Sequence, residues 1–146
     1  MQPTPPMRKA TVAMYTGAAL TLVAVLALVV DQSGGGLARH LHDTYPGRAP
    51  GWLSMTTASI ATYLYALYGA GFVLWLWMAR KAGKGTRRVR ITATAAFVVG
   101  SVLLVYNFTQ PHPLMVTATG ALPCLSGLAA VALLWAGRST RKSVTA

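Results

Sequence analysis

The chain has 146 residues, of which 54% are hydrophobic and only 10% are charged, whereas soluble domains carry about 25% charged residues. This composition excludes an ordinary soluble globular protein and indicates a chain whose surroundings are largely lipid. Lys and Arg outnumber Asp and Glu by 13 to 2. These basic residues flank apolar runs, and the chain has no soluble domain that could bind in a nucleic-acid groove. We therefore do not expect nucleic acid as a partner.

Four apolar runs long enough to cross a bilayer follow one another, and none of them contains Asp, Glu, Lys, Arg or His. A hydrocarbon core about 30 Å thick needs roughly 20 helical residues. A segment alone in lipid must satisfy its own backbone hydrogen bonds, which favours helix, and the continuous apolarity argues against a β-barrel. The expected spans are residues 10–30, 52–79, 91–108 and 113–136.

The first run begins just after Arg8 and Lys9, as the apolar core of a secretory signal peptide does. It is longer than the roughly 7–15 residues of such a core, and no small-x-small cleavage site follows it directly. We therefore expect an uncleaved membrane anchor that ends before Asp31.

The outer loop, residues 31–51, is the longest polar segment between two spans. It opens with a flexible glycine run at 34–36. Leu37, Leu41 and Tyr45 then recur at i, i+4 and i+8, which predicts a short amphipathic helical turn or two on the surface. The Pro-Gly pair at 46–47 is a turn signal that ends it.

The second span carries two patterns at helical spacing. Small residues every four positions form a ridge that lets helix backbones approach closely. An aromatic stripe either packs between helices or lines a groove for a lipid tail or another apolar ligand. The ridge consists of Ala58, Thr62, Ala66 and Ala70, and the stripe of Tyr65, Tyr68, Phe72 and Trp75.

The fourth span contains a proline near its middle. Pro123 has no backbone donor and clashes with the carbonyl of Thr119, so we expect a kink, either static or part of a gate. The neighbouring Cys124 is the one cysteine of the chain and is expected to act as a small packing residue.

Loop charges predict the orientation. Only Arg39 and Arg48 lie between the first two spans, whereas the remaining Lys and Arg residues lie before the first span, in the basic inner loop 80–90 and in the basic tail 137–146. The positive-inside rule therefore places both termini in the cytoplasm. Tryptophans near the span ends, as interfacial anchors, agree with this: Trp52, Trp75, Trp77 and Trp135.

The histidines and carboxylates all lie on the outer side: His40, His42, His112, Asp31 and Asp43. Imidazole and carboxylate together can hold Zn²⁺ or Cu²⁺. His112, however, reaches the others only if the two outer loops fold together. We expect a solvated loop and assign no metal site.

The spans lack the groups on which membrane catalysis and coupled transport depend. There is no intramembrane acid or base for coupling, no axial histidine for haem and no base beside a nucleophile. A single cysteine excludes an intrachain disulfide and a C-x-x-C redox pair. We therefore assign no catalytic residue and no cofactor, and we do not expect an enzyme.

Three segments resemble a group of small, uncharacterised four-span integral membrane proteins of actinobacteria. They are LHDTYP at residues 41–46, the basic inner loop, and LPCLSGL at 122–128 followed by a basic tail. The resemblance implies a bacterial plasma membrane and supplies no functional residues.

These observations favour an all-α polytopic membrane protein with four transmembrane helices in an up-down bundle. The expected function is that of a non-enzymatic accessory or structural subunit, acting through helix–helix contacts with itself or with a larger membrane complex. The alternative is a small-molecule or lipid-binding protein, or a minor transporter, that uses an aromatic-lined groove on the second span. The basic inner loop either only orients the chain or also binds anionic lipids.

Overall fold

The computed structural model describes residues 5–82, 86–110 and 113–143, with side chains described up to residue 136. Within these residues the chain forms five α-helices and no strand. Their bounds are Pro5–Ser33 (α1), Gly36–Thr44 (α2), Pro50–Ala82 (α3), Arg87–Phe108 (α4) and Leu114–Ser143 (α5). The predicted all-helical class is confirmed.

Four of the described helices, α1, α3, α4 and α5, are long and apolar enough to cross a membrane. Each contains one predicted span, except that Pro113 precedes α5. The helices run past the predicted spans because hydropathy marks where lipid ends, whereas a helix continues until a cap or breaker stops it. Pro50 begins α3 at the first helical position, where its missing N–H is not needed, and the Thr86 hydroxyl accepts from the Val89 amide at the start of α4.

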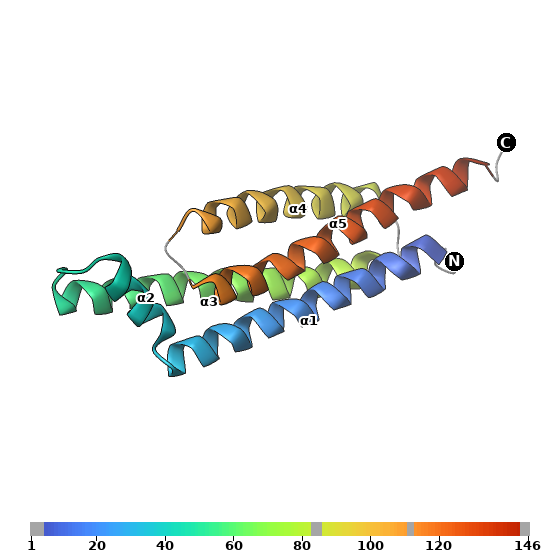
Figure 1. Cartoon of the computed structure of the whole chain (residues 1–146). Coiled ribbons are helices and arrows are strands. Elements are labelled where there is room, and N and C mark those ends of the chain that lie inside the picture. Colours follow the sequence, from blue (N-terminus) through green and yellow to red (C-terminus); the bar gives the residue numbers. More distant parts are fainter. Residues whose placement is uncertain (1–4, 83–85, 111–112, 144–146) are drawn as a thin grey trace.

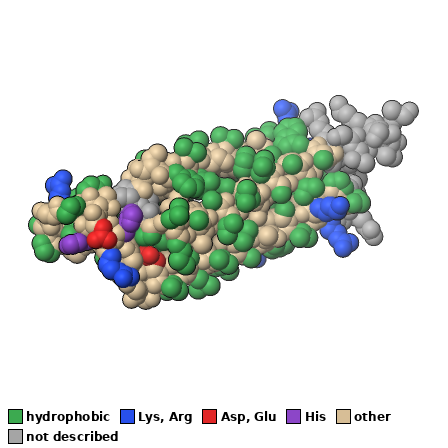
Figure 2. Space-filling model, viewed as in Figure 1, with side chains coloured by type: hydrophobic (Ala, Val, Ile, Leu, Met, Phe, Trp, Pro, Cys, Tyr) green, Lys and Arg blue, Asp and Glu red, His purple; other side chains and the backbone are tan. Residues whose placement is uncertain are grey.

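The four long helices run alongside one another, and α1 begins at the same end of the molecule at which α5 ends (Figure 1). α1 packs most extensively against α5 and then against α3, whereas α4 packs against α5 and barely touches α3. Hydrophobic side chains cover the flank of the molecule, while charged residues lie towards its two ends (Figure 2). This distribution fits a bundle surrounded by lipid.

The main core lies near the α3–α4 connection and consists largely of small side chains, which allow close helix packing. Its buried members are Ala10, Met14, Met78, Ala79, Ala82, Val89, Ala93, Ala130 and Leu134. Only Val89 and Ala93 of α4 are buried, and both lie in its first two turns. α4 is therefore held firmly at its beginning and loosely along the rest of its length.

α2 confirms the short amphipathic helix predicted in the outer loop. Leu37 and Leu41 are 1% and 0% exposed, and α2 contacts both α1 and α3. An Asp31 carboxylate oxygen accepts from the Leu37 amide at 2.9 Å, so α1 supplies the cap for the start of α2. Gly35 precedes the helix in the left-handed region, at φ 65°, where glycine is favoured.

Candidate functional site

A cavity of about 330 Å³ lies between α1, α3, α4 and α5. Its volume is at the lower end of the range for small-molecule sites. Its walls are mostly Ala, Gly, Leu and aromatic side chains, and none of the described residues that line it is charged or a histidine. The cavity exists because α4 barely contacts α3 beyond its first two turns.

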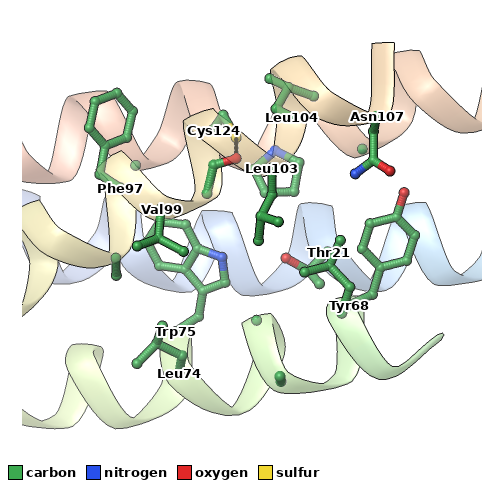
Figure 3. Close-up of a pocket in the computed structure, with 18 of the residues that line it drawn as sticks. Thr21, Tyr68, Leu74, Trp75, Phe97, Val99, Leu103, Leu104, Asn107 and Cys124 are labelled. Atoms are coloured by element: carbon green, nitrogen blue, oxygen red, sulfur yellow. Dashed lines mark hydrogen bonds between the residues drawn. The ribbon is translucent and has the colours of Figure 1, made fainter. Parts of the chain in front are cut away.

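Aromatic side chains form one end of the cavity, and glycines on the opposing helices accommodate them (Figure 3). The Trp75 indole lies over Gly17 of α1, where an added Cβ would be 2.7 Å from Cε2. A Cβ on Gly127 of α5 would be 3.1 Å from the Phe97 ring and 3.5 Å from Trp75. The small residues of α1 and α5 thus receive the aromatic rings of α3 and α4.

Polar side chains gather at the other end. Thr21, Tyr68, Asn107 and Thr117 line the cavity there, and the Tyr68 hydroxyl and the Asn107 amide point toward one another (Figure 3). The Tyr68 hydroxyl rests on α5, since a Cβ on Gly120 would be 2.6 Å from it. Thr21 donates to the Gly17 carbonyl at 2.8 Å.

Two of these polar groups retain hydrogen-bonding capacity. Within the part of the chain that the structure describes, neither the Tyr68 hydroxyl nor the Thr117 hydroxyl makes a hydrogen bond. Thr117 as a whole is only 8% exposed. A hydroxyl that makes no hydrogen bond in the described chain can donate to and accept from a ligand, which makes this end of the cavity suited to a polar ligand atom.

The cavity opens on the flank of the bundle. Three of its lining residues are exposed, and all lie where α3 faces α4: Ala70 and Leu74 on α3, and Val99, 58% exposed, on α4. Val73 of α3 and Val102 of α4 are also exposed. The opening is therefore bordered by exposed apolar side chains of both helices.

α5 continues through Pro123 to Ser143. Pro123 and Cys124 both line the cavity, and the Cys124 Sγ lies 3.9 Å from the Gly100 carbonyl oxygen of α4. This weak contact joins α4 to α5 at the wall of the cavity.

The aromatic stripe predicted on the second span divides into two parts. Tyr68 and Trp75, seven positions apart, line the cavity, whereas Tyr65 is 37% exposed and Phe72 does not line it. Trp75 was expected at the membrane interface and instead packs inside the bundle against the main core. The wall on α4 was not predicted from the sequence. A signal was present in the spacing of its lining residues along one helix face: Ala93, Ala96, Gly100, Leu103 and Asn107.

The other tryptophans lie beside basic residues near the ends of the helices. The Arg48 guanidinium is 5.0 Å from the Trp52 ring, and Lys81 is 5.9 Å from Trp77. Arg90 is 5.9 Å from the ring of Trp135. The indole N–H of Trp135 donates to the Thr94 hydroxyl at 3.2 Å and so links α5 to α4.

The outer histidines do not form a metal centre among the described residues. The His42 Nδ1 and an Asp43 carboxylate oxygen are 3.7 Å apart, and both side chains are exposed. His112 lies outside the described residues, and Asp31 is engaged with the start of α2. No group of three possible ligands occurs in the described part of the chain.

Comparison with models of known protein families, with curated proteins and with solved structures finds no match to this chain. The cavity and the exposed residues around it are therefore the features from which a function can be inferred.

Proposed function

We propose that the chain is a non-enzymatic integral membrane protein that binds an apolar or amphiphilic small molecule from the bilayer in the cavity between its helices. The observation that carries this proposal is an apolar cavity whose opening is bordered by exposed apolar side chains of α3 and α4. Apolar walls do not favour water as the occupant, whereas hydrocarbon chains surround the opening.

Two glycines on α3 provide a matched test. Gly71 lines the cavity and Gly69 does not, and an added Cβ at either position has nothing within 4 Å. Gly71→Leu should fill part of the cavity and reduce the apolar molecules that native mass spectrometry detects on the gently purified protein. Gly69→Leu should leave them unchanged. Equal retention by the two variants and the parent protein, or no retained molecule on any of them, would contradict the proposal.

The proposed setting is a bacterial plasma membrane that the chain crosses four times in up-down order, with both termini in the cytoplasm. The strongest support for this orientation is the distribution of Lys and Arg. They are concentrated before the first span, between the second and third spans, and after the fourth span. Lys84 and the other residues at 83–85 lie outside the described part of this basic loop.

A second candidate function is that of a subunit that associates through α3. The ridge of small residues predicted on this helix consists of Ala58, Thr62, Ala66 and Ala70. All four residues are exposed, so none of the other described helices buries them. Such a face allows close approach of another membrane helix, from a second copy or from a larger complex.

The two functions can be separated by substitution. Ala66→Leu places a large side chain on the exposed face without touching the cavity lining. Crosslinking in native membranes should detect an oligomer or a defined partner of the parent protein and of Gly71→Leu, and a weaker product with Ala66→Leu. A parent protein that remains monomeric with no co-purifying chain would exclude the subunit function and leave the cavity unaffected.

A further inference from the structure

We propose that the cavity selects a single-chain amphiphile with an uncharged, hydrogen-bonding head, which the Tyr68 and Thr117 hydroxyls and the Asn107 amide hold while its chain lies against Trp75 and Phe97. This inference depends on the proposed binding function and adds the chemical class of the ligand. It follows from the uneven distribution of polar atoms within the cavity.

The polar end is built from three helices. Tyr68 comes from α3, Asn107 from α4 and Thr117 from α5, and all three line the same cavity (Figure 3). Gly120 allows the Tyr68 hydroxyl to lie against α5, close to the helix turn that carries Thr117. Hydroxyls that make no hydrogen bond within the described chain can donate to and accept from a ligand head.

The opposite end is mostly apolar. Trp75 and Phe97 lie there between Gly17 and Gly127, with Met78, Ala93 and Ala130 of the main core beyond them. Flat aromatic rings and small side chains provide extended apolar contact, and the indole N–H of Trp75 is the one polar side-chain group among these residues. A hydrocarbon chain therefore fits this end better than a second polar group does.

The head must be uncharged because the described lining contains no Asp, Glu, Lys, Arg or His to compensate a charge. An ion at membrane depth without a counter-charge is strongly disfavoured, so an ionised fatty acid or a phosphate head is a poor ligand. The cavity volume, about 330 Å³, favours one chain over two. The remaining candidates are single-chain ligands whose head is a hydroxyl, carbonyl or amide group.

Trp75 is a built-in reporter of occupancy. A variant that keeps Trp75 alone carries Trp52→Phe, Trp77→Phe and Trp135→Phe, and its fluorescence is measured in liposomes of unlabelled lipid. Three brominated probes are compared at equal chain length: a monoacylglycerol, an ionised fatty acid and an alkane. A companion variant that keeps only the exposed Trp77 measures quenching by probe dissolved in the bilayer.

The monoacylglycerol should quench Trp75 at roughly tenfold lower mole fraction than the other two probes, as expected for one or two hydrogen bonds in a desolvated site. Tyr68→Phe combined with Thr117→Val keeps the shapes of both side chains and should remove that advantage. Tyr65→Phe is the matched control, because Tyr65 is exposed and does not line the cavity.

The outcomes distinguish this inference from the proposed function. Equal quenching by the monoacylglycerol and the alkane, both stronger than for Trp77, would overturn selection of the head and leave apolar binding standing. No quenching beyond the Trp77 reference would overturn both. If the variant that keeps Trp75 alone does not fold, native mass spectrometry of the parent protein decides the same question. The parent should retain monoacylglycerol in preference to alkane and Tyr68→Phe/Thr117→Val should not, whereas the same retention by both proteins would overturn the selection of the head.

Discussion

The indole of Trp75 lies against Gly17 so closely that a Cβ at position 17 would be 2.7 Å from its Cε2 atom. Real Cβ atoms do not approach a ring this closely, so any side chain at position 17 must displace the indole. Because Trp75 also lines the cavity, this one contact connects the packing of α1 on α3 with the shape of the binding site.

Gly17→Ala should therefore lower the free energy of unfolding by about 1–3 kcal/mol, the usual cost of overpacking a well-packed interior. Unfolding in mixed micelles of increasing SDS content measures it. Combining Gly17→Ala with Trp75→Leu should recover part of the loss, since the smaller side chain leaves room for the methyl group. Gly69→Ala, where nothing lies within 4 Å, should be neutral or slightly stabilising. A Gly17→Ala protein as stable as the parent would contradict the close contact.

The Asp31 cap at the start of α2 can also be tested by substitution. Asp31→Ala removes the carboxylate that accepts from the Leu37 amide and should destabilise α2 by about 1 kcal/mol, the typical cost of losing a helix cap. Hydrogen exchange at the Leu37 amide should accelerate accordingly. Asp43→Ala is the control, because Asp43 is exposed and pairs only with His42 among the described residues. Unchanged exchange in Asp31→Ala would show that α2 is held by Leu37 and Leu41 alone.

Cysteine labelling tests the orientation. In a Cys124→Ala background, Gly35→Cys should react with a membrane-impermeant thiol reagent from outside the cell. Gly83→Cys, which lies outside the described residues, should react only after the membrane is opened, because the basic loop around it is expected in the cytoplasm. External labelling at position 83 would reverse the proposed topology.

The basic inner loop either only orients the chain or also binds anionic lipid, and two arginine substitutions distinguish these alternatives. Arg87 and Arg88 are exposed in the first turn of α4, whereas Arg90 lies beside Trp135. Near an anionic surface each basic residue contributes roughly 1 kcal/mol of attraction. Arg87→Gln with Arg88→Gln should reduce co-purified anionic lipid, and Arg39→Gln with Arg48→Gln, in the outer loop, should not. The same lipid content in both pairs would leave the loop with orientation as its only role.

The number and placement of the long helices could be predicted because transfer into hydrocarbon is a local property of each segment. The ends of the helices could not, because caps and prolines outside the apolar runs set them, as Pro50 and Thr86 do. The cavity was beyond prediction since it depends on how far α4 diverges from α3. Trp75 illustrates the difficulty. Its position along the chain suggests an interfacial residue, whereas the structure packs its partly buried ring against Gly17 of another helix.

The extensive packing of α1 against α5 has a consequence for biogenesis. These are the first and last of the described helices in chain order, so the largest contact in the bundle forms only after α5 has been synthesised. Contacts so distant in sequence form late. Ala10 and Met14 of α1 can pack against α3 before then, but they meet Ala130 and Leu134 only once α5 is inserted.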